Sequence, residues 1–378
     1  MSRLRWSTAG ESHGEALLAV IEGLPFGLAL DLARIDRELA RRQSGFGRSS
    51  RQQLERDRVE VVAGAYRGAT SGAPLVLRVR NKDQSLPTLP PLHRPRPGHA
   101  DLAGAIKFDT NDARPVLERS SARETVARVA AGAVAKMVLE RVGVRVEGFV
   151  AAIGSVVLRD PPGDGFAWIA ERDASPVWCP HSATSAAMCD VISAAGAAGD
   201  TLGGVVEVRA AGVPAGLGSL MQAGTRLDAA LAAAVMSVPS VKAVEIGDGI
   251  AAAALGGHAV HDPITFDGGA IRRGSNRAGG IEGGMSNGQP LVVRAYLKPL
   301  ATTKHAMASV DLRDGTRAPS DPQRSDVCAV PSGAVVVEHV VGLVVLAALL
   351  DSVPADTVED LDSGFRTWVE RRAGLPGA

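Results

Sequence analysis

The sequence predicts a mixed α+β fold, and three observations support this class. Several segments repeat apolar residues at spacings of three and four, as one face of a helix does. Other segments are rich in β-branched residues and are flanked by Gly or Pro, as strands are. The two kinds of segment do not alternate strictly, which favours α+β over a parallel α/β sheet. The 43 glycines and the 3% of aromatic residues indicate tight turns and a core of Val, Ala and Leu.

The clearest predicted helix begins after Ser121. Ser121 and Glu124 have the spacing of a capping box. The apolar residues that follow predict one buried helical face, and they are Val126, Val129, Ala130, Ala133, Val134, Met137 and Val138. Three further helices are predicted at Asp31–Arg42, Leu227–Met236 and 333–350.

Four strands are predicted, each bounded by turn residues: Val59–Ala63, Pro74–Arg80, Gly204–Ala210 and Pro290–Leu297. The segment from about Pro161 to Cys189 is the most irregular and is expected to form surface loops. Because no linker is apparent, residues 1–378 are expected to form a single domain, with about 374–378 disordered.

Composition argues against several classes of function. The chain carries 41 Lys and Arg against 41 Asp and Glu, so it is not a general polyanion binder. Tyr and Phe are too scarce for base stacking, and nucleic acid is therefore not an expected partner. Cys179, Cys189 and Cys328 are too few for a disulfide framework and form no Cys-x-x-Cys pair, so no metal site is expected.

The apolar stretch 333–350 is long enough to raise the question of a membrane span. Glu338 and His339 lie inside it, and charged groups are costly at bilayer depth, so a buried core helix is favoured. The N-terminus lacks the apolar region of a secretory signal. The expectation is a cytoplasmic protein with no membrane partner.

Four short motifs carry most of the functional information. They are GESHG at 10–14, RPRPGHAD at 94–101, RSSARET at 119–125 and RSDVC at 324–328. Each alone is a weak signal, but together and in this order they resemble the chorismate synthase family. The resemblance covers nearly the whole chain, and the stretch 112–118 is similar to actinobacterial members.

The resemblance implies a fold and a reaction. The fold would be a β-α-β sandwich, in which antiparallel sheets enclose central helices, assembled as a homotetramer. The reaction would be the anti-1,4-elimination of phosphate from 5-enolpyruvylshikimate 3-phosphate, which gives chorismate in the last step of the shikimate pathway toward aromatic amino acids. This lyase reaction would use reduced FMN without net redox change. NADPH would act only indirectly, through flavin reduction by an external flavin reductase.

Two alternatives remain open at this stage. A paralogue with the same fold could act on a modified shikimate-type substrate in secondary metabolism, since some residues of the implied flavin site depart from those usual in the family. The other alternative is a flavin-binding or anion-binding protein without catalysis. The presence of His13, His99 and Asp326 argues against that second alternative.

The resemblance assigns proton chemistry to a small set of residues. His13 is implied to be the acid that assists the departure of phosphate, and its flanking glycines let the backbone approach a ligand closely. His99 is implied to stabilise or protonate the reduced flavin, which suits the neutral-pH titration of imidazole. Asp326 is implied to accept the proton from flavin N5, and Ser12 and Ser121 complete the catalytic set. Each assignment has a purely structural alternative. His99 could be a loop histidine paired with Asp101, and Asp326 could form a surface ion pair with Arg324.

Basic residues are concentrated between positions 41 and 58, where six arginines stand against two acidic residues. Such a run is more often a solvated face, but its glycines and the resemblance favour a mobile anion-binding loop. The implied substrate carries a phosphate and two carboxylates, which guanidinium groups bind in a bidentate way. The residues implied to bind it are Arg42, Arg48, Arg96, Arg123 and Arg324.

The flavin site is implied by the resemblance. Arg119 and the two serines after it crowd the start of the predicted long helix, where free N–H groups favour an anion. The glycine-rich run 279–284 lacks the Gly-x-Gly-x-x-Gly pattern, so tight turns between strands are its plain reading. The residues implied to bind FMN are Arg119, Ser120, Ser121, Pro239, Ser240, Gly283, Lys298, Pro299, Leu300, Ala301, Thr302 and Arg324.

Overall fold

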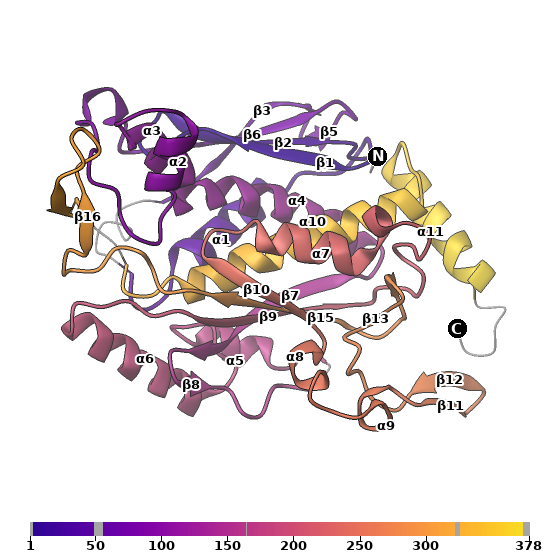
Figure 1. Ribbon diagram of the computed structural model, residues 1–378. Coiled ribbons are helices and arrows are strands. Elements are labelled where there is room, and N and C mark those ends of the chain that lie inside the picture. The colour runs from indigo at the N-terminus through magenta and orange to yellow at the C-terminus, as the bar shows by residue number, and fades with distance from the viewer. Residues whose placement is uncertain (1–2, 49–55, 164, 322–325, 373–378) are drawn as a thin grey trace.

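The computed structural model describes residues 3–48, 56–163, 165–321 and 326–372. Figure 1 shows three layers, with one sheet above, helices in the middle and a second sheet below. Both main sheets are antiparallel. This arrangement is the β-α-β sandwich that the motifs predicted, and the α+β class is confirmed.

The upper sheet has four strands in the order β1-β2-β6-β3. They are β1 (Arg5–Ala9), β2 (Ala16–Glu22), β6 (Leu75–Arg80) and β3 (Val59–Ala63). Burial alternates along β2 and β6, which places every second side chain against the helical layer. The loop between β1 and β2 carries the first motif, so strand pairing fixes the position of that motif.

The lower sheet has five strands in the order β10-β15-β9-β7-β8. They are β10 (Val241–Ile246), β15 (Leu291–Leu297), β9 (Gly204–Ala211), β7 (Arg145–Ile153) and β8 (Val156–Val157). The central strands are buried along most of their length because helices cover one face and the segment 158–200 contributes side chains below.

Four helices fill the middle layer, and they are α1 (Leu32–Gln43), α4 (Thr125–Arg141), α7 (Leu227–Met236) and α10 (Val330–Ser352). In α4, 14 of the 17 residues are buried, so the expectation of a single apolar face was wrong. The physical reason is that α4 packs against the upper sheet on one side and against α1 and α10 on the others.

The apolar stretch 333–350 lies within α10. Among the described residues, α10 is the one helix long and apolar enough to span a membrane, but 89% of its most apolar 18-residue window is buried inside the protein. Glu338 and His339 are fully buried there. The prediction of a core helix is therefore confirmed.

The buried charges of α10 belong to an ion network. Glu338 accepts hydrogen bonds from Arg41 (3.0 and 3.1 Å), from Lys136 and from the backbone N–H of Gly148 (2.9 Å). His339 Nε2 lies 3.4 Å from Glu38. Two carboxylates and an imidazole are close enough to suggest a cation site, but the Lys136 ammonium already supplies the positive charge between them.

The other helices and hairpins lie around the three layers (Figure 1). The outer helices are α2 (Asp101–Lys107), α3 (Arg114–Ser120), α5 (Ile169–Ala174), α6 (Ser182–Ala197), α8 (Gly249–Ala252), α9 (Gly257–Val260) and α11 (Val358–Arg372). Two-stranded hairpins are β4–β5 (Ala65–Tyr66, Ala69–Thr70), β11–β12 (Ile264–Asp267, Ala270–Arg273), β13–β14 (Ile281–Glu282, Met285–Ser286) and β16–β17 (Ala308–Val310, Arg317–Pro319). The 3₁₀ turns are η2 (Leu86–Thr88), η3 (Ala122–Glu124) and η4 (Ala223–Thr225).

All the helices and strands predicted from the sequence are present, with ends displaced by a few residues at most. The segment 161–189 was predicted wrongly, because it contains α5 and the start of α6. It also buries Trp168, Trp178 and Cys179, and the ring of Trp168 meets that of Phe149 edge-on at 5.0 Å. The terminal residues 374–378 lie outside the described part of the chain.

Candidate active site

The GESHG motif forms the loop between β1 and β2. Gly10 has a φ of +102°, and a Cβ atom there would lie 2.2 Å from the carbonyl oxygen of Ala16, so only glycine fits. The loop is held against α3, since the backbone N–H of Ser12 donates to the carbonyl oxygen of Glu118 (3.0 Å). The ring atom Nδ1 of His13 lies 2.8 Å from the Glu118 carboxylate. Strand pairing and α3 together therefore position His13.

The RSSARET motif lies at the junction of two helices. Arg119 and Ser120 end α3, Ser121 is extended, and η3 leads into α4. The hydroxyl of Ser121 donates to that of Ser12 (3.2 Å) and accepts from the backbone N–H of Arg123 (3.3 Å). The first and third motifs thus meet at their serines. The Ser120 hydroxyl instead donates to a carbonyl within α3.

The RSSARET motif does not lie at the free N-terminus of α4, because η3 precedes that helix. The capping box expected between Ser121 and Glu124 is not formed. Glu124 turns away and hydrogen-bonds Thr8 (2.5 Å) and Arg128 (2.9 Å). Arg119 reaches the same place by donating to the Thr8 carbonyl (2.9 Å), while Arg128 donates to Ser237 (2.8 Å). A chain of contacts therefore links Arg119 to the end of α7.

Arg123 and Arg42 share one buried carboxylate. Arg123 donates to both oxygens of Asp57 (2.9 and 2.8 Å), and Arg42 donates to one of them (2.9 Å). Burial alone would raise the pKa of Asp57, but the two guanidinium groups hold it below its usual range. Asn81 accepts from Arg123 (2.9 Å) and donates to the Gly14 carbonyl (2.8 Å). This amide connects the arginines to the GESHG loop.

Arg42 has little contact with solvent. Its side chain is 6% exposed, and burial lowers its pKa to about 10 against the opposing charge of Asp57, so it stays cationic at neutral pH. The neighbouring charges of Arg123 and Arg48 lower the pKa further. Cations crowded in this way favour binding of an anion.

Arg48 is buried near Asp326, with its Nη1 atom 3.6 Å from the carboxylate and 6% of its side chain exposed. Its Nε and Nη2 atoms are buried and have no hydrogen-bond partner among the described residues. Burial lowers the pKa of Arg48, while Asp326 and Asp57 raise it, so Asp57 interacts with Arg42, Arg48 and Arg123. Arg324 lies outside the described residues.

The described part of the basic run, residues 41–48 and 56–58, begins in a helix and continues in a loop, and Arg51 lies outside the described residues. Arg41 and Arg42 belong to the last turn of α1, and Arg41 points to Glu338 in the core rather than to the site. The loop that follows is packed, since a Cβ atom on Gly45 would lie 2.9 Å from Pro331. A Cβ atom on Gly47 would lie 2.8 Å from a methyl group of Ile192. Both glycines have positive φ, which explains their place in the run.

A second cluster surrounds His99. The ring atom Nδ1 of His99 contacts the buried carboxylate of Asp101, the first residue of α2. Arg96 donates from Nε to the same carboxylate (2.8 Å) and from Nη1 to the hydroxyl of Thr302 (3.1 Å). Burial would raise the pKa of Asp101, but His99 and Arg96 lower it well below its usual range. His99 is therefore paired with a carboxylate, as its structural alternative predicts. Its Nε2 atom is the ring nitrogen that does not contact Asp101.

The predicted flavin loop joins this cluster. Lys298 hydrogen-bonds the carbonyl oxygen of Gly98 through its ammonium group and the carbonyl oxygen of Ser240 through its backbone N–H (2.9 Å). Burial and the nearby charge of Lys242 lower the pKa of Lys298. Leu300 is fixed by a hydrogen bond from Thr201 to its carbonyl oxygen (2.8 Å).

Gly283 is not brought to this cluster within one chain. The glycine-rich run lies at the Leu291 end of β15, where Gly279 accepts from the Val292 N–H (3.1 Å), whereas Lys298 follows the other end of that strand. Gly283 forms the turn of the β13–β14 hairpin with a positive φ. The plain reading of tight turns between strands is confirmed.

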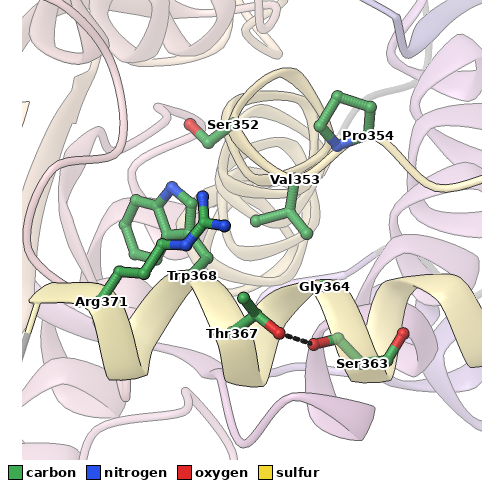
Figure 2. Close-up of a pocket in the computed structure, with 8 residues that line it drawn as sticks. All are labelled: Ser352, Val353, Pro354, Ser363, Gly364, Thr367, Trp368 and Arg371. Atoms are coloured by element: carbon green, nitrogen blue, oxygen red, sulfur yellow. Dashed lines mark hydrogen bonds between the residues drawn. The ribbon is translucent and has the colours of Figure 1, made fainter.

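A cavity lies at the C-terminal end of α10, far from both clusters. Figure 2 shows it between the C-terminal end of α10 and α11, with Val353, Thr367, Trp368 and Arg371 among its walls. Its volume is about 480 Å³. The described residues of the RSDVC motif, 326–328, adjoin the opposite, N-terminal end of α10, so this cavity is separate from the site of the motifs.

Comparison with known proteins agrees with the four motifs. The sequence model of the chorismate synthase family matches residues 4–350. This chain belongs to the chorismate synthase family. The chorismate synthase of Symbiobacterium thermophilum is 48% identical over 98% of this chain and 100% of that protein. The chorismate synthase of Mycolicibacterium vanbaalenii is 45% identical over 99% of both chains.

A crystal structure of a chorismate synthase superposes with a TM-score of 0.81 and 35% identity, covering 98% of this chain and 99% of that one. The lyase class and the place in the shikimate pathway that the sequence predicted are thereby confirmed. Membership of this family implies a biosynthetic enzyme with a flavin cofactor. The alternative of a secondary-metabolism paralogue is not favoured.

The structure also adds residues that the motifs did not indicate. Asp57 and Asn81 hold the arginines, Glu118 holds His13, and Lys242 lies near Lys298. Asp101, which holds His99, is an exception. Asp101 stands inside a motif and was visible as a partner of His99. The others have no local signal, because their partners are 15 to 105 residues away in sequence or in another strand.

Proposed function

We propose that this chain binds 5-enolpyruvylshikimate 3-phosphate and reduced FMN and eliminates phosphate to give chorismate. The observation that carries the proposal is the buried arginine cluster beside the GESHG loop. Arg48 keeps two buried donor atoms without a partner among the described residues, and burying unpaired donors is costly unless a ligand supplies acceptors. A substrate with a phosphate and two carboxylates would supply them.

Asp57 has a clear role in this proposal. Its carboxylate fixes the planes of Arg42 and Arg123 before any ligand arrives, so little side-chain freedom remains to be lost on binding. Its single negative charge offsets only part of the charge of three nearby arginines. The remaining positive field favours an anionic substrate. Arg96 and Arg324 stay predictions as further substrate residues.

His13 is the proposed acid for the leaving phosphate. Its Nδ1 atom is occupied by Glu118, so Nε2 is the atom that can hold the proton for transfer. Ser121 donates its hydroxyl hydrogen to Ser12 beside it, which leaves the hydroxyl hydrogen of Ser12 for an oxygen of the leaving phosphate. Breaking the substrate C–O bond sends the electron pair to the phosphate, which the proton and the arginine charges stabilise.

The residues of the second cluster fit a flavin phosphate and ring. Lys298 and Lys242 are like charges close enough to lower the pKa of Lys298, an arrangement that an anion would relieve. Gly98 leaves space, because a Cβ atom there would come no closer than 3.6 Å to Lys298 and 3.7 Å to Ala301.

We propose that Arg119, Ser120, Ser121, Pro239, Ser240 and residues 298–302 hold FMN in this region. Reduced FMN, when bound, supplies electron density for the elimination and takes up the substrate hydrogen. His99 would hold a proton at Nε2, since Asp101 occupies its Nδ1. Asp326, whose carboxylate lies beside Arg48, would accept the proton from flavin N5. Gly283 would not contribute from the same chain.

The surroundings of the reaction follow from the same proposal. NADPH would be used only by an external flavin reductase, and the protein would act in the cytoplasm as a homotetramer. The departures at Pro239, Ser240, Leu300 and Ala301 from residues usual in the family remain compatible with flavin binding, since the backbone of Ser240 and Leu300 makes the contacts described above.

The direct test is an anaerobic assay with 5-enolpyruvylshikimate 3-phosphate and photoreduced FMN. Chorismate absorbance and phosphate release are followed together. We expect equal amounts of both products with reduced flavin and neither with oxidised flavin. Absence of turnover, while FMN binding is confirmed by fluorescence quenching, would refute the proposed substrate. Absence of FMN binding would refute the proposed cofactor site.

A further inference from the structure

A fully buried carboxylate lies directly beneath the proposed acid. Glu118 on α3 is 1% exposed, and its Oε2 atom accepts from the backbone N–H of His13 (3.1 Å) and from the ring Nδ1 of His13 (2.8 Å). The backbone carbonyl of the same glutamate accepts from the N–H of Ser12 (3.0 Å). One residue of α3 therefore makes three contacts with two consecutive residues of the GESHG loop.

The charge state of Glu118 decides which ring nitrogen carries hydrogen. Burial would raise the pKa of Glu118, but the hydrogen bonds and charge of His13, together with Arg114, lower it. An ionised carboxylate only accepts hydrogen bonds, so the Nδ1 atom of His13 must be the donor. The charged groups that face the ring are Glu118 and Arg114 on α3 and Asp83, whose carboxylate lies 3.9 Å from Nε2.

We propose that Glu118 is a positioning residue for His13. It keeps hydrogen on Nδ1 and fixes the ring so that Nε2 faces the leaving phosphate. This inference rests on the proposed function, in which His13 is the acid. The protonated ring gives its Nε2 hydrogen to the oxygen that leaves with phosphate, as the C–O bond breaks. The neutral ring that remains keeps its hydrogen on Nδ1, bonded to Glu118, and regains the other proton from solvent.

The tautomer of His13 distinguishes a positioning role of Glu118 from a merely structural one. A free neutral imidazole favours hydrogen on Nε2, whereas the second nitrogen's partner sets the choice in a protein. With hydrogen on Nε2 and none on Nδ1, the hydrogen bond to Glu118 would be lost. Loss of the carboxylate should therefore change the tautomer of His13 even when the fold is kept.

Solid-state ¹⁵N NMR of the full chain labelled with [¹⁵N]histidine tests the tautomer directly. The His13 signals are assigned by their loss in His13→Gln, at a pH where the ring is neutral. We expect the Nδ1–H form in the wild type and the Nε2–H form in Glu118→Ala. The signals of His99, whose partner is Asp101, should stay unchanged in Glu118→Ala and serve as an internal control. A wild-type ring in the Nε2–H form would overturn the proposal, whether or not the variant folds.

Steady-state kinetics provide the second readout. We expect Glu118→Ala to lower kcat by about tenfold or more, as loss of a tautomer-fixing carboxylate does elsewhere, with KM changed by no more than about threefold. Glu15→Ala is the matched control, because Glu15 is an exposed carboxylate of the same loop, and its one ion pair with the described residues is with Arg80 at 3.5 Å. An unchanged kcat in Glu118→Ala would overturn the positioning role. Full turnover in His13→Ala would instead refute the proposed acid and leave the tautomer result standing.

Discussion

The buried side chain of Arg48 is the single residue that most directly indicates a ligand site. A guanidinium group remains charged when buried, so two Arg48 donors that lack a partner among the described residues represent a cost that this part of the chain does not recover. We expect Arg48→Ala to raise KM for the substrate by about tenfold or more, because a charged hydrogen bond is worth about 1.5–3 kcal/mol. The measurement is initial rates at saturating reduced FMN.

The matched control is Arg58→Ala. Arg58 belongs to the same basic run, but its side chain is 70% exposed and pairs with Asp36 at 2.8 Å. Exposed pairs contribute little, so KM should stay within about twofold of the wild type. An unchanged KM in Arg48→Ala would remove that residue from the substrate site.

His99 and Asp326 are the other residues on which the chemistry depends. We expect His99→Ala and Asp326→Ala to keep the fold and to lose most turnover, by about a hundredfold, as loss of proton-transfer groups does. Circular dichroism checks the fold, and the anaerobic assay checks turnover. Wild-type rates in both variants would show that the proton-handling residues lie elsewhere.

The motifs identified residue types but not their supports. His13, His99 and Arg123 stand out in the sequence because glycine, proline and serine surround them. Glu118 is 105 residues from His13, and Asn81 is 42 residues from Arg123. These pairings depend on how β2, β6 and α3 come together, so no local pattern could indicate them.

At the scale of elements, the contact between α4 and α10 depends on glycine. A Cβ atom on Gly132 would lie 2.4 Å from the Cβ of His339 and 2.6 Å from its carbonyl oxygen. We expect Gly132→Ala to lower the free energy of unfolding by about 1–3 kcal/mol, since overpacking forces helices apart. Urea denaturation measures the change.

Gly342 on α10 provides a matched substitution in the facing helix. A Cβ atom there would lie 3.4 Å from the side chain of Lys136, an ordinary contact. Gly342→Ala should therefore be neutral or stabilising by up to about 1 kcal/mol, because alanine favours the helix. Equal destabilisation by both substitutions would contradict the close approach at Gly132.

The ion network between α1, α4 and α10 predicts a dependence on pH. Burial lowers the pKa of His339, so the unfolded chain takes up a proton first as pH falls below about 6.5. Burial would raise the pKa of Glu338, but Arg41 and Lys136 bring it well below its usual range. Its contribution is complete above about pH 4.3 and is lost on further acidification.

We therefore expect the free energy of unfolding to fall in two stages, the first as pH drops below about 6.5 and the second as pH drops below about 4.3. Urea denaturation at several pH values measures this. Glu338→Gln should cost about 3–5 kcal/mol at pH 7, because it leaves buried cations without their partner. The same substitution should weaken the stage at lower pH. A free energy that is constant from pH 7 to pH 5 would contradict the buried, neutral His339.

Sequence patterns were partly misleading because the central helices are covered on all sides. α4 and α10 lack a polar face, so periodicity located them but could not show which side met which layer. Strands β1, β2, β7 and β10 were not predicted as strands. Their pairing joins distant segments, as β2 with β6 and β7 with β9. Such pairings follow from the whole fold.

At the scale of the molecule, both sheets share one hydrophobic core. Leu77 of the upper sheet, Val134 of α4, Val341 of α10 and Val208 of the lower sheet belong to a single cluster of buried residues. The central helices therefore cannot be removed from one sheet without exposing the other. We propose on this basis that the chain is a single domain and a single cooperative unit.

Differential scanning calorimetry tests the single unit. We expect one transition, with no separate melting of the upper sheet. Gly132→Ala disturbs the contact between the helix that supports the upper sheet and the helix that supports the lower one. If the sheets unfold together, this substitution should shift the whole transition to lower temperature by a few degrees, at about 2–4 °C per kcal/mol or less for a chain of this size. Two resolved transitions in the wild type, or a transition split by Gly132→Ala, would show instead that each sheet and its helix unfold as separate units.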